Sequence, residues 1–282
     1  MFQEKKIYMK FTQLMAVAGS ILILFACKDN RYELTVINSS SFPDQQITLD
    51  GPIRQRLLTE SPEHSPEEIH PAFAESQNKL DEMVSLAENL RHHPSDSLWM
   101  VLASTWEDFR INYSGIHEWP VAREDSLPVA VGADATRKWF ELTGKLLKFS
   151  GEIRFADALE KLVYEQNVPV LSEELLKPVF YTHRYDQIFI NLIGSSSLNH
   201  LHTTGGTVKL IQLTDYPVGN EMVLKCECGD VRFLDVFIRI PSWAVNPAVT
   251  YGNVKYVARP GEYCEISRKW KNGDEIRVVL KN

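Results

Sequence analysis

Basic residues are the scarcer kind of charge in this sequence, with 30 Lys and Arg against 37 Asp and Glu and a formal net charge of -7. Beyond the first ten residues, no cluster of Lys or Arg stands out. A protein that binds nucleic acid needs a basic stripe that neutralises phosphate groups. The composition therefore predicts no nucleic-acid partner, and sugars fit it better as ligands.

Long hydrophobic runs are missing as well. The apolar stretch at residues 14–26 holds about a dozen residues, whereas a helix needs roughly 20 apolar residues to span the hydrocarbon core of a membrane. Lysines in the first ten residues precede this stretch, and the small residue Ala26 ends it. A charged start followed by a short apolar run predicts a signal peptide over residues 1–26.

Residues 24–27 read Leu-Phe-Ala-Cys and resemble a lipobox, in which the cysteine thiol is lipidated before the peptide is cut. We predict cleavage before Cys27 and a lipoprotein of the bacterial outer membrane, because lipid chains hold a protein on a bilayer by about 0.8 kcal/mol per buried methylene. Lys28-Asp29 is similar to the signals that send lipoproteins of Bacteroidetes-type bacteria to the outer surface. The alternative is a buried cysteine of a core helix, against which the charges that follow at once argue.

Cysteine is rare, with four residues in the chain. With Cys27 used by lipid, three remain, and an odd number argues against a disulfide framework. Cys226 and Cys228 flank one residue, so their side chains would share a face of an extended strand. Tetrahedral zinc sites usually space cysteines by two to four residues and use four ligands, so we interpret this pair as core-facing strand residues.

The part of the chain before residue 170 predicts a tether followed by helices. Residues 27–64 mix polar residues with short β-leaning runs, which indicates a tether and a short N-terminal β segment. Residues 65–170 carry apolar residues at helical spacing and predict a helical domain, in which we expect Val101, Leu102 and Phe109 to face inward. The expected helices span about residues 65–93, 97–109, 133–150 and 153–166.

Beyond Pro178 the apolar period changes from helical to alternating, with turn residues at short, regular intervals. Helices first and strands afterwards indicate an α+β fold class with a C-terminal antiparallel β-sandwich at residues 178–282. The boundary is expected near residues 168–180. The expected strands span residues 188–193, 207–213, 222–228, 233–240, 254–257 and 276–280.

Histidine and tryptophan supply the remaining candidate ligand-binding residues. His200 and His202 would share a face if extended and could form a metal pair, but the polar residues around them favour a solvated turn. The tryptophans are candidates for stacking on sugars, although packing in the core is the commoner fate of such residues. They are Trp106, Trp119 and Trp139.

Three C-terminal pieces carry a family resemblance. Residues 238–244 read Ile-Arg-Ile-Pro-Ser-Trp-Ala, residues 260–263 read Pro-Gly-Glu-Tyr, and residues 268–274 read Arg-Lys-Trp-Lys-Asn-Gly-Asp. In order and spacing they resemble the β-L-arabinofuranosidase-type glycosidases of glycoside hydrolase family 127 (GH127). Residues 149–160 are similar to the last barrel helices of that family, and the resemblance covers roughly residues 97–282.

The resemblance implies that the helical domain is a partial (α/α) barrel, because the family has a full ring of paired helices and this chain offers about four. We therefore expect a truncated family member. Read without the family, Ser242-Trp243 is a plug of the core, and residues 272–274 form a tight turn between two strands.

The resemblance also implies a zinc site of cysteines and a glutamate, with one cysteine as nucleophile and a separate glutamate as general acid/base. Its Glu-x-Cys pair would fall at Gly132 and Asp134, and its adjacent cysteines would fall between residues 178 and 189, where there is no cysteine. We predict that the zinc site and the nucleophile are lost and that no cofactor is bound. Only Glu118, in the place of the acid, and Trp119, as a substrate-binding residue, match.

These observations leave three hypotheses. The leading one is a membrane-anchored, catalytically degenerate lipoprotein that binds carbohydrate, with arabinose-containing glycans as candidates. The second is an active glycoside hydrolase that uses a carboxylate site, with Glu118 and a second group such as Asp134. The third is a non-enzymatic scaffold or gene remnant.

Overall fold

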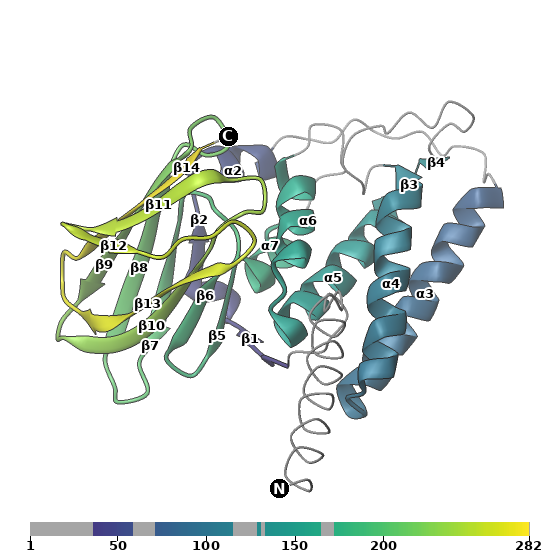
Figure 1. Ribbon diagram of the computed structural model, residues 1–282, viewed down its shortest axis with the longest axis horizontal. Helices are drawn as coiled ribbons and strands as arrows, with labels where there is room; N and C mark the ends of the chain where they lie inside the picture. The colour runs from purple at the N-terminus through teal and green to yellow at the C-terminus, as the bar shows by residue number, and fades with distance from the viewer. Residues whose placement is uncertain (1–35, 59–70, 115–128, 131–132, 165–171, 282) are drawn as a thin grey trace, which may run out of the picture.

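The computed structural model describes residues 36–58, 71–114, 129–130, 133–164 and 172–281. Figure 1 shows a layer of helices beside two sheets that face one another. Helices α2, α6 and α7 lie nearest the sheets, and α5, α4 and α3 follow outwards. The structure confirms the α+β class with a C-terminal β-sandwich.

The helices form where apolar residues recur at helical spacing, and α5 begins and ends at the predicted residues. Gly151 follows α5 with a φ of 71° and donates its N–H to the Leu147 carbonyl at 2.7 Å, as in a glycine C-cap. A β-carbon at Gly151 would strike the side chain of Ile37. The helices are α2 (Gly51–Leu58), α3 (Pro71–His92), α4 (Asp96–Asn112), α5 (Ala133–Ser150), α6 (Ile153–Tyr164) and α7 (Glu173–Phe180).

Aromatic side chains form the core of the helical layer. Trp106 and Trp139 are fully buried and stack with ring centroids 5.5 Å apart. Phe155 meets the Trp106 ring edge-on at 4.8 Å, and the Trp106 indole donates to the Thr143 hydroxyl at 2.9 Å. The interpretation of these two tryptophans as core residues is therefore confirmed.

The expected orientation of Val101 is wrong. Its side chain is 47% exposed, whereas Leu102 and Phe109 are buried as predicted. The buried stripe of α4 runs through Trp99, Leu102 and Trp106, and Val101 lies about 200° around the helix from Trp99 at 3.6 residues per turn. This segment has apolar residues on two faces of the helix, so the sequence pattern did not decide which face is buried. The buried face is the one that carries the tryptophans.

The sandwich consists of two sheets with alternating buried and exposed residues, as the sequence pattern predicted. One correction concerns strand direction, because β6 pairs with β10 in parallel, so the sandwich is not purely antiparallel. The strand orders of the two sandwich sheets are β1-β5-β6-β10-β13 and β12-β11-β14-β9-β8-β7-β2, and a separate sheet pairs β3 (Tyr113–Ser114) with β4 (Val129–Ala130). The C-terminal strands are β5 (Tyr181–Arg184), β6 (Gln187–Ile190), β7 (Ser196–Leu201), β8 (Thr207–Thr214), β9 (Glu221–Cys228), β10 (Arg232–Arg239), β11 (Val245–Tyr251), β12 (Val254–Tyr256), β13 (Tyr263–Trp270) and β14 (Glu275–Lys281).

The N-terminal β segment belongs to the sandwich. β1 (Ser40–Ser41) pairs with β5, and β2 (Ile47–Leu49) pairs with β7, so the segment adds an edge strand to each sheet. Just before β1, the N–H groups of Ile37 and Asn38 donate to the Phe149 carbonyl at the end of α5, at 2.8 and 3.1 Å. These bonds satisfy a carbonyl that the helix end leaves open, and they join the sheets to the helices.

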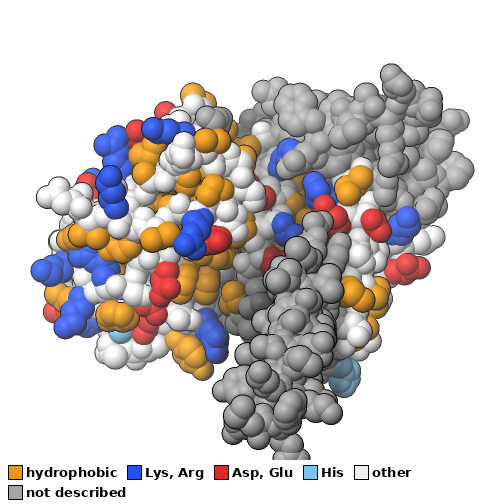
Figure 2. Space-filling model, in the orientation of Figure 1, with side chains coloured by type: hydrophobic (Ala, Val, Ile, Leu, Met, Phe, Trp, Pro, Cys, Tyr) orange, Lys and Arg blue, Asp and Glu red, His pale blue; other side chains and the backbone are white. Residues whose placement is uncertain are grey.

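Within the described ranges, no helix is both long enough and apolar enough to cross a membrane. On the face shown in Figure 2, Lys and Arg side chains are interspersed with Asp and Glu among hydrophobic side chains. The visible described surface therefore has no broad field of one sign.

Candidate functional site

The residues that the sequence singled out for lipidation and catalysis lie outside the described residues. Cys27, Glu118 and Trp119 fall in residues 1–35 and 115–128. Gly132 is outside the described residues too, whereas Asp134 lies in the first turn of α5. The roles assigned to these residues stay predictions.

The segment expected to hold the adjacent cysteines folds as the end of α7, strand β5 and the turn into β6. Most of its apolar residues pack into the core, and Tyr181 is fully buried. The Tyr181 hydroxyl contacts the Ser196 hydroxyl at 2.7 Å and accepts a hydrogen bond from Gln212 at 2.8 Å, while burial raises its pKa to about 12. This segment therefore supplies structural contacts where the family would supply ligands.

The cysteines of the described residues lie on sandwich strands, and two of them, Cys226 and Cys264, are poor nucleophiles. Burial raises the pKa of Cys226 to about 12 and that of Cys264 to about 11, so both are thiols at neutral pH. Within the described ranges, no group of three or more His, Cys, Asp or Glu side chains is placed to hold a metal ion. These residues do not fit the zinc site of the family, and its loss elsewhere stays a prediction.

A buried charge cluster joins α6 to the end of β10. Arg239 is fully buried and forms ion pairs with Asp157 and with Glu160, whose Oε2 lies 2.6 Å from Nη2 of Arg239. Its Nε donates to the Asn191 carbonyl at 2.5 Å, and Asp157 also accepts from the Ser242 N–H at 3.3 Å. The cluster fixes the loop after β10 against the helical layer.

Tyrosine hydroxyls surround this cluster. Tyr263 donates to the Asn191 side-chain oxygen at 2.6 Å, and burial raises the pKa of its phenol. Burial and the neighbouring Glu160 carboxylate raise the pKa of Tyr216 as well. Both hydroxyls therefore stay protonated at neutral pH and serve as hydrogen-bond donors.

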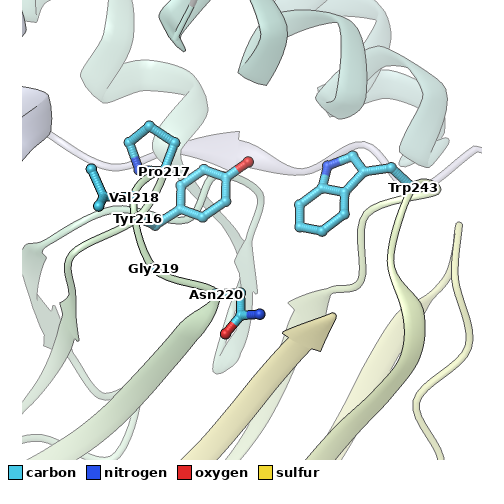
Figure 3. A pocket seen from close by; sticks show the side chains of 6 residues that line it. All are labelled: Tyr216, Pro217, Val218, Gly219, Asn220 and Trp243. Carbon is cyan, nitrogen blue, oxygen red and sulfur yellow. The ribbon is translucent and has the colours of Figure 1, made fainter. Parts of the chain in front are cut away.

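Tyr216 connects the cluster to a surface pocket of about 610 Å³. Figure 3 shows Tyr216 and Trp243 projecting towards one another from two loops, with Asn220 beside them. The two rings are nearly parallel, with an interplanar angle of 7° and centroids 6.2 Å apart. Trp243 is 38% exposed, so its interpretation as a core plug is wrong: the ring lies over the pocket rather than in the core.

The loop that carries Tyr216 is a tight turn between β8 and β9. The Asp215 carbonyl accepts from the N–H groups of Val218 at 3.0 Å and of Gly219 at 3.4 Å. Gly219 leaves room for the Asp215 carboxylate, which a β-carbon at this position would displace. The turn holds Tyr216 at the pocket wall.

A second cluster ties the two sheets together at the turns before β6 and after β7. His200 and His202 are 4% and 7% exposed, so the expected solvated turn is wrong. His200 Nε2 lies 2.8 Å from Asp186, which also accepts from the Thr203 N–H at 3.1 Å. The His202 ring accepts from the Thr204 N–H at 3.1 Å and contacts a backbone carbonyl, so it is a structural residue rather than a free ligand.

Acidification is expected to destabilise the fold through His200. Burial lowers the pKa of His200, against the opposing effect of Asp186, so the unfolded chain binds a proton more readily than the folded chain. The stability from this group is complete above the unfolded pKa of about 6.5 and is lost as the pH falls through the folded pKa. Partial burial raises the pKa of Asp186, but hydrogen bonds from Thr203 and His200 outweigh it and lower this pKa. Protonation of Asp186 in more acidic solution therefore destabilises the fold further.

Urea unfolding between pH 7 and pH 5 measures this effect. His200→Gln is expected to flatten the decline of the unfolding free energy in this range, and His93→Gln, at an exposed position, serves as the control. An equal decline in the wild type and His200→Gln would assign the pH dependence to other groups.

The residues of the charge cluster and of the pocket lie within the sequence motifs, but the motifs did not indicate their roles. Arg239 and Trp243 lie in residues 238–244, and Asp157 and Glu160 lie in residues 149–160. The sequence offered one indication of the cluster. An arginine lies inside an apolar strand pattern, and two acidic residues lie one helical turn apart upstream. Their convergence across 82 residues of chain is a property of the fold.

The family model for the β-L-arabinofuranosidase GH127 middle domain matches residues 187–282. A solved glycoside hydrolase is 18% identical over 71% of this chain and 45% of its own, with a TM-score of 0.58. A GH127 β-L-arabinofuranosidase from Geobacillus stearothermophilus T6 is 17% identical over 72% of this chain and 41% of its own, with a TM-score of 0.57. A further GH127 β-arabinofuranosidase is 17% identical over 81% and 47% of the two chains, with a TM-score of 0.58. No curated protein sequence matches.

These structures share the fold of this chain, which spans less than half of their length. The family match covers β6 to the last described strand, including Tyr216, Arg239 and Trp243. The β-sandwich of this chain therefore matches the GH127 middle-domain family, and the fold as a whole is similar to that of solved GH127 β-L-arabinofuranosidases.

Proposed function

We propose that this chain is a lipid-anchored, carbohydrate-binding relative of the GH127 β-L-arabinofuranosidases that lacks their zinc-thiolate catalysis. One observation carries the proposal: the sandwich signature is retained, while the segment that should hold the adjacent cysteines is a packed helix end and strand without thiols. Carbohydrate as the ligand class rests on the relation to glycoside hydrolases.

The pocket at Tyr216 and Trp243 is the proposed binding surface. Its lining side chains are aromatic, apolar or amide, and none is charged, which suits a neutral sugar. Ring faces offer apolar contact to the C–H side of a sugar, and the Asn220 amide offers hydrogen bonds to hydroxyl groups. Anchoring by the Arg239 cluster keeps the Trp243 loop in place before a ligand arrives.

Replacing Trp243 with alanine is expected to raise the dissociation constant for arabinose-containing oligosaccharides at least about tenfold, or 1.4 kcal/mol, because the larger ring face is lost. Titration calorimetry of the full chain in detergent measures it. Phe233→Ala is the matched control, because Phe233 is an exposed aromatic residue of the same sandwich at 52% exposure. Equal affinity of the wild type and Trp243→Ala would remove this pocket as the site.

Anchoring through lipid at Cys27 and an outer-membrane location complete the proposal. Cys27→Ser is expected to move the protein from the membrane fraction to the soluble fraction, and mass spectrometry of the wild type should show acyl chains on the N-terminal cysteine. An unmodified Cys27 in membrane-bound protein would contradict lipid anchoring and would leave the sugar site untouched.

A further inference from the structure

A second pocket, of about 760 Å³, lies at an edge of the sandwich between the two sheets. Residues of β1 and β5 from one sheet and of β7 from the other line it, and we call it the edge pocket. Because β7 and β8 are antiparallel, Leu201, which lines the edge pocket, lies at the opposite end of these strands from the turn that carries Tyr216. The edge pocket is therefore separate from the pocket at Trp243.

Packed rings form the base of the edge pocket. Phe42 and His200 line it and are each only 4% exposed. The Phe42 ring lies 4.4 Å from the ring of His183 and meets His200 edge-on at 5.8 Å, centroid to centroid. Asp186 holds His200 at 2.8 Å. These contacts fix the rings before a ligand arrives, so the base of the pocket is formed in advance.

Tyr185 lines the edge pocket in an unfavourable backbone conformation. It is the first residue of the two-residue turn between β5 and β6, and its φ of 56° favours glycine. Its side chain is 76% exposed, so packing does not explain a tyrosine at this position. Bulky residues in such conformations gather at ligand-binding sites. The exposed ring is therefore the part of the pocket that a ligand meets first.

Arg184 gives the edge pocket a positive charge. It is exposed, and it is the only Lys, Arg, Asp or Glu among the described residues that line the pocket. The neighbouring carboxylate of Asp186 is engaged by His200 at 2.8 Å and by the Thr203 N–H at 3.1 Å. The guanidinium of Arg184 forms no ion pair within the described part of the chain, so it is available to an anionic ligand.

We propose that the edge pocket binds a hexuronate, which is a sugar ring that carries a carboxylate. The planar guanidinium of Arg184 pairs with the carboxylate through two hydrogen bonds, and the Tyr185 ring contacts the C–H face of the sugar. Hydroxyl and amide groups such as those of Ser40 and Gln46 bond the sugar hydroxyls. The inference rests on the proposed function for carbohydrate as the ligand class, and it does not require the pocket at Trp243.

Calorimetric titration of the full chain in detergent with digalacturonate and with its neutral dimethyl ester tests the charge. The ester keeps the sugar rings and their linkage, and it is expected to bind at least about tenfold more weakly than the acid. In Arg184→Gln the two ligands should bind equally, because the group that distinguishes them is gone. Arg91→Gln, at an exposed position of α3, is the matched control and should bind as the wild type does.

Tyr185→Asn tests the ring without disturbing the turn. Asparagine adopts a positive φ more readily than tyrosine, so the unfolding temperature is expected to stay the same or to rise. Loss of the ring is expected to weaken the binding of digalacturonate roughly fivefold or more. A role of Tyr185 in the structure alone would leave this affinity unchanged.

Trp243→Ala separates the two pockets and is expected to bind digalacturonate as the wild type does. Equal binding of the acid and the ester by the wild type would overturn the proposal, as would unchanged binding of the acid by a folded Arg184→Gln. Displacement of digalacturonate by an equal concentration of inorganic phosphate would show a general anion site and would also overturn it. Loss of neutral-sugar binding in Trp243→Ala concerns the other pocket only.

Discussion

Replacing Arg239 with methionine is expected to lower the free energy of unfolding by about 3–5 kcal/mol, because removal of one partner leaves buried charges without compensation. The side chains of Asp157 and Glu160 are only 17% and 5% exposed, and both lose their cation. For a protein of this size the loss corresponds to a fall of roughly 6–20 °C in melting temperature. Urea and thermal unfolding measure it.

Arg277→Met is the matched control for this substitution. Arg277 pairs with Glu221 at 2.7 Å on the surface, where the two side chains are 60% and 51% exposed. Such a pair contributes less than about 1 kcal/mol. Adding Asp157→Asn and Glu160→Gln to Arg239→Met should recover part of the loss, because the uncompensated charges are then removed. Similar losses from Arg239→Met and Arg277→Met would contradict the structural role of the cluster.

Trp106→Ala is expected to cost about 3–5 kcal/mol, because it opens a large cavity in the helical layer. The Trp106 ring packs between Trp139 and Phe155, and all three side chains are fully buried. Met100→Ala, at a half-exposed position on the same helix, should stay within about 0.5 kcal/mol of the wild type. Urea unfolding followed by tryptophan fluorescence and circular dichroism compares the variants.

Phenylalanine substitutions separate the hydrogen bond from the packing. Trp106→Phe leaves the buried Thr143 hydroxyl without its donor, which costs about 1–3 kcal/mol in addition to the lost ring. Trp139→Phe removes a buried indole N–H that has no partner among the described residues, so it should cost less. A greater loss from Trp139→Phe would show that ring volume dominates at both positions.

The local pattern of apolar residues predicted those helices and strands in which the pattern is unambiguous. The limits of α5 followed from a single apolar stripe and a glycine cap, and β8, β9 and β14 followed from strict alternation. The sequence did not predict β7, because its residues 196–201 include serines, asparagine and histidine. It did not predict β11 either, because that strand contains Pro247. Pro178 inside α7 hid that short helix, because proline usually ends a helix.

The candidate site depended on contacts that a sequence does not display. Arg239 and Trp243 belong to a sequence motif. However, the burial of Arg239 and the exposure of Trp243 follow from the position of α6 against β10. His200 looked like a turn residue because its neighbours are polar, yet Asp186 from the opposite sheet covers it. In each case a partner distant in the chain decided the environment.

Release of arabinose is the most direct test of the central claim, which is that this chain binds carbohydrate without hydrolysing it. The full chain, shown by calorimetry to bind an arabinose-containing oligosaccharide, is incubated with β-L-arabinofuranosides with and without added zinc, and free arabinose is quantified over time. The account predicts binding and no release above the uncatalysed background. Release of arabinose that Glu118→Gln abolishes would contradict it and would identify an active hydrolase with a carboxylate site.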